Sequence, residues 1–179
     1  IEVKSSFIKK PGTLITKRAN LNNNRIITGI TSTHNDAKVT LVGVKDRPGV
    51  AASIFKPLSI NSINVDMVVQ NISPNGKETD LTFTIKAEDL NKTKKIIQEN
   101  KSIKFKKVLF QKGVSKISII GVGMITTPGV TFRMFQALAN KKINIQVIST
   151  SEIKISVLIN KKDAKKAVVT LHKEFKLQE

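Results

Sequence analysis

One pattern of glycine, proline and apolar residues occurs twice in this chain, about 80 residues apart. The triplet Pro48-Gly49-Val50 returns at 128–130, and the pair Ile63-Asn64 returns at 143–144. Phe55 and Phe135 keep the same separation. Turn, helix and strand positions therefore repeat together, which predicts two copies of one folding unit. A length of 179 residues allows each copy roughly 75 residues, the size of a small α+β domain.

The spacing of apolar residues predicts strand, helix, strand, strand and helix in each copy. In the first copy we expect strands at 38–44, 63–72, 81–85 and 105–111, and helices at 49–59 and 90–100. In the second copy we expect strands at 116–122, 143–149 and 153–159, and helices ending near 138 and 175. We expect Ala52, Phe55 and Leu58 to form the apolar side of the first helix.

This order predicts an α+β fold of two tandem ferredoxin-like βαββαβ units, with antiparallel sheets and helices on one face. The second copy runs out of chain after its last helix, while a strand-like segment at 26–33 precedes the first copy. We therefore expect domains at 36–113 and 114–179, the second completed by strand 26–33, and a linker at 1–25. The uncovered sheet face predicts a homodimer.

The net charge of +18 comes mostly from lysine, which contributes 27 of the 31 basic residues. Clustered cations favour binding to phosphates, so a basic nucleic-acid-binding α+β module is one open interpretation. The lysines are scattered along the chain, however, and arginine forks and stacking aromatics do not cluster. We therefore expect a diffuse surface charge and no nucleic-acid partner.

Composition excludes several kinds of chemistry. The chain has no cysteine and two distant histidines, so disulfides, thiolate catalysis and a histidine metal site are not expected. The four aspartates at 36, 46, 66 and 80 lack ligand spacing, and we expect them to be solvated or to cap helices. No catalytic or metal site is therefore predicted. No charged-then-apolar leader and no run of 18 apolar residues occurs, which predicts a cytoplasmic protein with no membrane partner.

Two glycine motifs remain as candidate ligand sites. Gly121-x-Gly123 follows a strand, but Thr126 stands where a dinucleotide loop has its third glycine, so we interpret it as a strand-to-helix turn. The segment 46–51, Asp-Arg-Pro-Gly-Val-Ala, leads into a helix. Free amides at a helix start attract a carboxylate, and Asp46 could take an ammonium group. Together they fit the two ends of an amino acid, although a plain tight turn is an equal alternative.

Longer strings resemble the regulatory ACT domains of aspartate kinase. The first copy carries the resemblance in 46–51, in Ile63-Asn-Val-Asp-Met-Val-Val-Gln-Asn-Ile-Ser73 and in Thr79-Asp-Leu-Thr-Phe83. The second copy carries it in 128–131, in 143–145 and in Ile148-Ser-Thr-Ser-Glu-Ile-Lys-Ile-Ser-Val157. The resemblance covers nearly the whole chain. It implies that threonine, and often lysine, binds between ACT units and holds a kinase in an inhibited state.

The resemblance also implies site residues by their position in these strings. A threonine site would be lined by Asp46, Gly49, Ala51 and Gln70, and closed by Asn144 and Ile145 from a partner's second unit. Positions of possible second-effector contact or feedback control are Gly129, Thr131, Ser151 and Glu152. The chain departs from the family at Lys142 and Gln146, where a glycine and an acidic residue are frequent.

A kinase domain that uses ATP and Mg²⁺ is also implied, as a catalytic domain or subunit that the chain would regulate. Within the segment 1–25, Val3-Lys-Ser-Ser-Phe7 and Pro11-Gly-Thr-Leu-Ile15 resemble the exit from that domain. This favours a fragment of a longer enzyme over a separate regulatory subunit. An ACT-type amino-acid sensor that controls another enzyme or a transcription factor is the alternative function.

Overall fold

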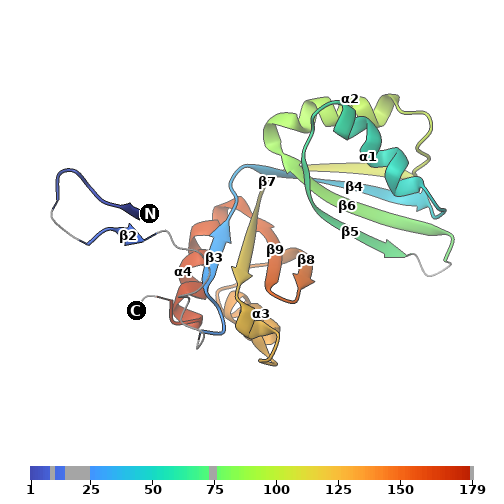
Figure 1. The fold of residues 1–179 in the computed structure, drawn as a ribbon. Coiled ribbons are helices and arrows are strands. Elements are labelled where there is room, and N and C mark those ends of the chain that lie inside the picture. Colours follow the sequence, from blue (N-terminus) through green and yellow to red (C-terminus); the bar gives the residue numbers. More distant parts are fainter. Residues whose placement is uncertain (9–10, 15–24, 73–75, 178–179) are drawn as a thin grey trace.

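One long strand carries the chain from the first unit into the second (Figure 1). In this computed structural model, which describes residues 1–8, 11–14, 25–72 and 76–177, β7 spans Lys107–Ile120. Its first half pairs with β4 (Asp36–Lys45) and its second half with β9 (Lys154–Asn160). We predicted two separate strands here, which is wrong: Gly113 takes φ +73 in a bulge, and the strand continues through it.

The strands form one antiparallel sheet in the order β5-β6-β4-β7-β9-β8. The outer strands are β5 (Val65–Ile72) and β8 (Ile145–Ser151), and β6 (Glu78–Lys86) lies between β5 and β4. A short strand that precedes the first unit, β3 (Gly29–Ser32), pairs with the second half of β7, with Gly29 opposite Ile120. The second unit thus has four strands in its part of the sheet.

Four helices complete the two units, and in each unit they cover one face of the sheet (Figure 1). They are α1 (Val50–Ile60), α2 (Leu90–Glu99), α3 (Val130–Asn140) and α4 (Ala164–Glu174). Short 3₁₀ turns at Ala87–Asp89, Val122–Met124 and Lys161–Asp163 precede α2, α3 and α4. This arrangement confirms the predicted α+β class with antiparallel strands and helices on one face.

Each unit has its own apolar core. In the first, Ile54 and Leu58 of α1 pack with Leu90 and Ile97 of α2 against the sheet. The second unit repeats this packing with residues of α3 and α4, and Ile27 joins that core at 2% exposure. Our prediction for the apolar side of α1 was wrong at Ala52, which is exposed. The helix is rotated so that the buried stripe follows Val50, Ile54 and Leu58 at a spacing of four residues.

The two units also touch beyond β7. Met67, Val114 and Leu158 form a small buried cluster at the junction. Nearby, Lys116 of the second unit makes an ion pair with Asp66 of the first. Val147 of β8 packs against the cluster, so these contacts join the starts of β5 and β8 and fix how the two halves of the sheet meet.

The glycine pair at 121 and 123 lets backbone pass at close range. A Cβ added to Gly121 would lie 2.2 Å from the carbonyl oxygen of Ile26, and one added to Gly123 would lie 2.6 Å from the Cα of Ile26. The segment that leads into β3 therefore runs directly over this turn. Packing explains both glycines, and no nucleotide is needed to account for them.

The remaining described residues lie at the start of the chain. β1 (Glu2–Val3) and β2 (Thr13–Leu14) pair with each other as a separate two-stranded sheet. Residues 15–24 of the predicted linker and 178–179 of the second domain lie outside the described residues. Within the described part of the chain, no helix has both the length and the apolar character that a membrane crossing requires.

Candidate effector-binding site

The helix α1 begins at a glycine that leaves backbone amides available. Gly49 caps it with φ +85, a left-handed conformation that favours glycine, and no side chain bonds the cap. The first bond of the helix runs from the amide of Ser53 to the carbonyl of Gly49, 3.0 Å away. The amide of Ala51, earlier in this turn, therefore has no partner inside the helix. Such a helix start can accept a carboxylate.

Charged residues of both signs surround this helix start. Asp46 is exposed, and its own amide donates to the carbonyl of Lys77 at 3.0 Å, which fixes the loop. Its carboxylate has no ion pair among the described residues. A small cavity of about 90 Å³ adjoins the first residue of α1 and is lined in part by Lys45, Arg47 and Lys104. An anionic group and several cationic groups therefore lie at one helix start.

Sequence reasoning did not single out the three cations of this cavity. Arg47 lies inside the quoted motif and Lys45 directly precedes it, so proximity in the sequence could have indicated both. Lys104 comes from the loop after α2, and no local pattern connects it to the site. None of the four predicted first-unit residues lines this cavity.

Gln70 lies toward the same end of the first unit. It is exposed on the edge strand β5 and pairs with Leu81 of β6, which in turn pairs with Leu41 of β4. The ends of these three strands converge at Thr79, which is opposite both Ile72 and Val44. The structure thus places Gln70 near the end of the sheet where Asp46 and Gly49 lie, without a direct contact between them.

Asn144 and Ile145 lie at the opposite end of the first unit. Asn144 directly precedes β8 and Ile145 begins it, and the next residue, Gln146, accepts a hydrogen bond of 2.8 Å from the Nζ of Lys38. Lys38 and Asp46 are eight residues apart along β4 and its extension, which at strand rise is roughly 25 Å. Asn144 and Asp46 of one chain therefore cannot contact the same amino acid.

The second unit repeats the helix-start geometry. Gly129 caps α3 with φ +87, and Thr131 follows it on the exposed side. Ser151, the last residue of β8, and Glu152, in the turn to β9, are exposed. The next residue, Ile153, accepts a bond of 3.0 Å from the amide of Gly121, at the end of β7. All four predicted residues of this unit thus lie toward the same end of its sheet.

The two departures from the family pattern have structural consequences. Lys142 has φ +55, in the left-handed region that favours glycine, and its counterpart in the first unit, Ser62, has φ +57. The side-chain oxygen of Gln146 accepts the hydrogen bond from Lys38, and burial at the junction lowers the pKa of Lys38. An amide at 146 can accept this bond without adding a negative charge between the units.

Three of the four aspartates hold the fold together through hydrogen bonds or ion pairs of their carboxylates. Asp36 is 5% exposed, so the prediction that it is solvated was wrong. Its carboxylate accepts from the hydroxyl of Thr33 and pairs with Lys86 at 3.2 Å. Asp80 accepts a bond of 2.8 Å from the amide of Gly43. No three His, Cys, Asp or Glu residues in the described ranges are grouped to hold a metal ion.

Comparison with protein families matches the model described as "ACT domain" to residues 39–100 and again to 117–175. The two matches together cover more than half of the chain. They coincide with the two units, including the two helix starts described above.

Among individual proteins, this chain is similar to aspartate kinases. The aspartate kinase of Pseudomonas fluorescens is 45% identical over 179 residues, covering 99% of this chain and 43% of that protein. The aspartokinase of Helicobacter pylori is 43% identical, covering 98% and 44%. This chain thus spans less than half of these relatives.

A solved structure matches at nearly full length. The regulatory subunit of aspartate kinase from Thermus thermophilus, in a ligand-free form, superposes with a TM-score of 0.76 at 33% identity. The superposition covers 84% of this chain and 99% of that subunit.

Proposed function

Because this chain belongs to the ACT domain family, in the tandem form of aspartate kinase regulatory subunits, we propose that it is the allosteric region of an aspartate kinase and binds end-product amino acids. The observation that carries the proposal is the likeness to the Thermus thermophilus protein across 99% of that subunit. That protein is itself a regulatory subunit, so the similarity supports a regulatory role.

The first-unit helix start supports threonine as the effector. The carboxylate of threonine would meet the amides near Gly49 and Ala51, with Arg47 close by. The ammonium group of threonine would pair with Asp46. Gln70 would take the hydroxyl. A buried ligand with two opposite charges needs a partner for each, because an unpaired buried charge is strongly destabilising. The presence of both signs around one helix start is consistent with such a ligand.

A second copy of the chain would complete this site. Asp46 and Gln70 are exposed, so one chain alone cannot shield the ligand from water. Asn144 and Ile145 of the same chain lie next to Gln146, which bonds Lys38, and Lys38 is roughly 25 Å from Asp46 along the strand. We therefore assign these two residues to the site of a partner subunit, in a homodimer formed through ACT units.

The second helix start is our candidate for another effector, lysine. Gly129 and Thr131 would receive the carboxylate, as we propose for Gly49 and Ala51 in the first unit. Ser151 and Glu152 lie toward the same end, and Glu152 has no ion pair among the described residues. Its carboxylate would suit a second ammonium group.

Regulation would work by a shift between two arrangements of the units. An effector that binds one arrangement more tightly increases the population of that arrangement. Because β7 runs through both units and the junction cluster joins β5 to β8, a movement of one unit must displace the other or break these contacts. The proposed target is a kinase domain that transfers phosphate from ATP to aspartate with Mg²⁺, both of which we assign to that domain.

Titration calorimetry of the 179-residue chain with threonine tests the site. Asp46→Ala should weaken binding by about 2–5 kcal/mol if the ammonium pair is buried in the complex. Lys56→Ala, which removes an exposed charge from the same helix, should change it little. Equal affinities in the wild type and both variants would place the site elsewhere.

Sedimentation in the presence of threonine tests the dimer. We expect a dimer, and Asn144→Ala should weaken threonine binding without removing the helix-start contacts. A monomer at high protein concentration with threonine bound would contradict the shared site. Failure of every common amino acid to bind would contradict the sensor function of the chain itself.

A further inference from the structure

A wide groove between α3 and α4 carries a concentration of positive charge. Its volume is about 1080 Å³, and none of the predicted effector residues lines it. Seven of its lining side chains are cationic, and Glu174 is its one acidic residue among those described. Five lysines along it are exposed, and their ammonium groups make no hydrogen bond or ion pair with any described residue. We call them the basic cluster: Lys141, Lys162, Lys165, Lys173 and Lys176.

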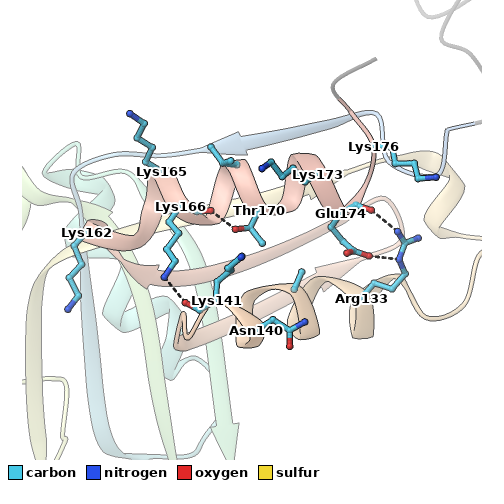
Figure 2. Close-up of a pocket in the computed structure, with 12 residues that line it drawn as sticks. Arg133, Asn140, Lys141, Lys162, Lys165, Lys166, Thr170, Lys173, Glu174 and Lys176 are labelled. Carbon is cyan, nitrogen blue, oxygen red and sulfur yellow. Dashed lines mark hydrogen bonds and ion pairs between the residues drawn. The ribbon is translucent and has the colours of Figure 1, made fainter.

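The other two cations of the groove are engaged in the fold (Figure 2). Arg133 donates to the carboxylate and the carbonyl of Glu174, at 2.9 and 2.8 Å, and lies over the ring of Phe175. The Nζ of Lys166 donates to the carbonyl of Lys141 at 2.7 Å, at the end of α3. These contacts leave the basic cluster as the groove's free charge.

The first unit provides an internal comparison for the groove. Positions in its second helix correspond to those of α4 at an offset of 74, since buried Leu90 and Ile97 match Ala164 and Leu171. Lys92 corresponds to Lys166 at this offset. Like Lys166, it bonds the end of the preceding helix, donating to the carbonyl of Asn61 at 2.6 Å. Equivalent residues can therefore be compared one by one.

At the five positions of the basic cluster the first unit has Asn61, Glu88, Asn91, Glu99 and Ser102. The charge at these positions is −2 in the first unit and +5 in the second. Over all twelve lining positions it is 0 and +6, because the first unit keeps Lys92 and has Lys95 at the position of Val169. A compositional preference for lysine acts on both units of one chain, so it does not account for this difference. The ammonium groups of Lys92 and Lys166 each bond the end of the preceding helix, whereas those of the five additional lysines bond no described residue.

From this contrast we propose that the groove between α3 and α4 binds a small molecule that carries several phosphate groups. A phosphomonoester carries about −1.5 to −2 at neutral pH, so two or three phosphates match the charge of the basic cluster. Lysine ammonium groups bind phosphate as point charges. From Lys162 to Lys176 the cluster extends roughly 20 Å along the helix, which suits an elongated anion.

The lining favours phosphate over other anions. No aromatic side chain lines the groove in the described part of the chain, so it offers no platform for stacking bases of single-stranded nucleic acid. Its apolar lining residues are Ala137 and Val169, which give an acidic amphipathic helix little to anchor on. Binding of the anion would therefore depend on charge. This proposal does not depend on whether the proposed amino-acid sites are correct.

Calorimetric titration of the 179-residue chain with inorganic triphosphate, at low and at physiological salt, tests the proposal. The test variant, Lys162→Glu with Lys173→Glu, installs the residues that the first unit has at the equivalent positions. The control variant, Lys95→Glu with Lys101→Glu, removes as much charge from exposed positions of the first unit. We expect the test variant to bind on the order of tenfold more weakly than the wild type and the control less than twofold.

Titration with ATP as a second ligand tests whether the phosphate groups alone supply the contacts. ATP and inorganic triphosphate should bind with similar affinity, because the phosphates supply the contacts. Equal weakening in the two variants would show a diffuse charge effect and overturn the proposal. Absence of triphosphate binding in the wild type, or tighter binding of a glutamate-rich peptide than of triphosphate, would also overturn it.

Discussion

Replacement of Gly121 by alanine tests how the strand that precedes the first unit reaches the second. A Cβ at this position would lie 2.2 Å from the carbonyl oxygen of Ile26 and 2.7 Å from the Cα of Ile27. Both are backbone atoms, and the adjoining backbone is held by a bond of 2.8 Å from the amide of Thr28 to the carbonyl of Ile120. The clash therefore cannot be relieved by a side-chain rotation.

The loss of unfolding free energy in Gly121→Ala depends on whether the 26–27 segment stays in place or shifts. Overpacking of this kind costs about 1–3 kcal/mol. If the segment shifts away instead, Ile27 leaves the core, and its burial contributes about 1.5–3 kcal/mol. Either way we expect a loss of roughly 1–3 kcal/mol, and a decrease in Tm of roughly 2–12 °C for a chain of this length. Backbone strain adds nothing, because Gly121 has φ 175.

Urea and thermal unfolding measure the loss, and Gly29→Ala is the matched control. Gly29 lies in β3, and a Cβ there meets nothing within 4 Å. Alanine at this strand position should be neutral or slightly stabilising. An arginine-specific protease provides a second readout, since cleavage after Arg25 should accelerate in Gly121→Ala alone. Equal stability of the two alanine variants would refute the packing of the 25–27 segment over this turn.

Two further predictions concern charges at the junction and next to it. Burial lowers the pKa of Lys38 below 10.5, so between the lowered value and 10.5 the unfolded chain binds more protons and stability should rise with pH. Lys38→Met should remove this part of the slope in urea unfolding over a pH series ending above 10.5, and an unchanged slope would contradict the assignment. Asp36→Ala should lower the free energy of unfolding by about 1–3 kcal/mol, because it leaves the hydroxyl of Thr33 and the ammonium of Lys86 without their partner. Glu88→Ala, an exposed control, should change stability little, and equal effects of these two substitutions would show that the buried carboxylate is not important.

Much of the fold was predictable from the repeat, because its signals are local. Apolar alternation indicated the strands, and the Pro-Gly-Val triplets indicated the starts of α1 and α3 within a residue or two. Both triplets contain the glycine that the left-handed cap requires. The amino-acid site could be proposed for the same reason, since its amides and Asp46 belong to one short loop.

Features that depend on distant segments were not predictable from local pattern. The sequence around Gly113 contains a glycine between two apolar stretches, which indicates a break as readily as a bulge. Only pairing with β4 on one side and β9 on the other shows that the strand is continuous. Asp36 likewise lies beside polar residues in the sequence, and it is the return of β6 with Lys86 that buries and pairs it.

The sequence by itself determined two βαββαβ units and the loops that start their first helices, because turn residues and apolar periodicity act over a few residues. The tertiary structure decided which charges share a surface. Lys141 comes from the end of α3 and Lys173 from α4, and their common groove exists only because the two helices pack side by side on the sheet. Likewise, the separation of Asn144 from Asp46 within one chain follows from strand order, since charge proximity is a property of packing rather than of sequence spacing.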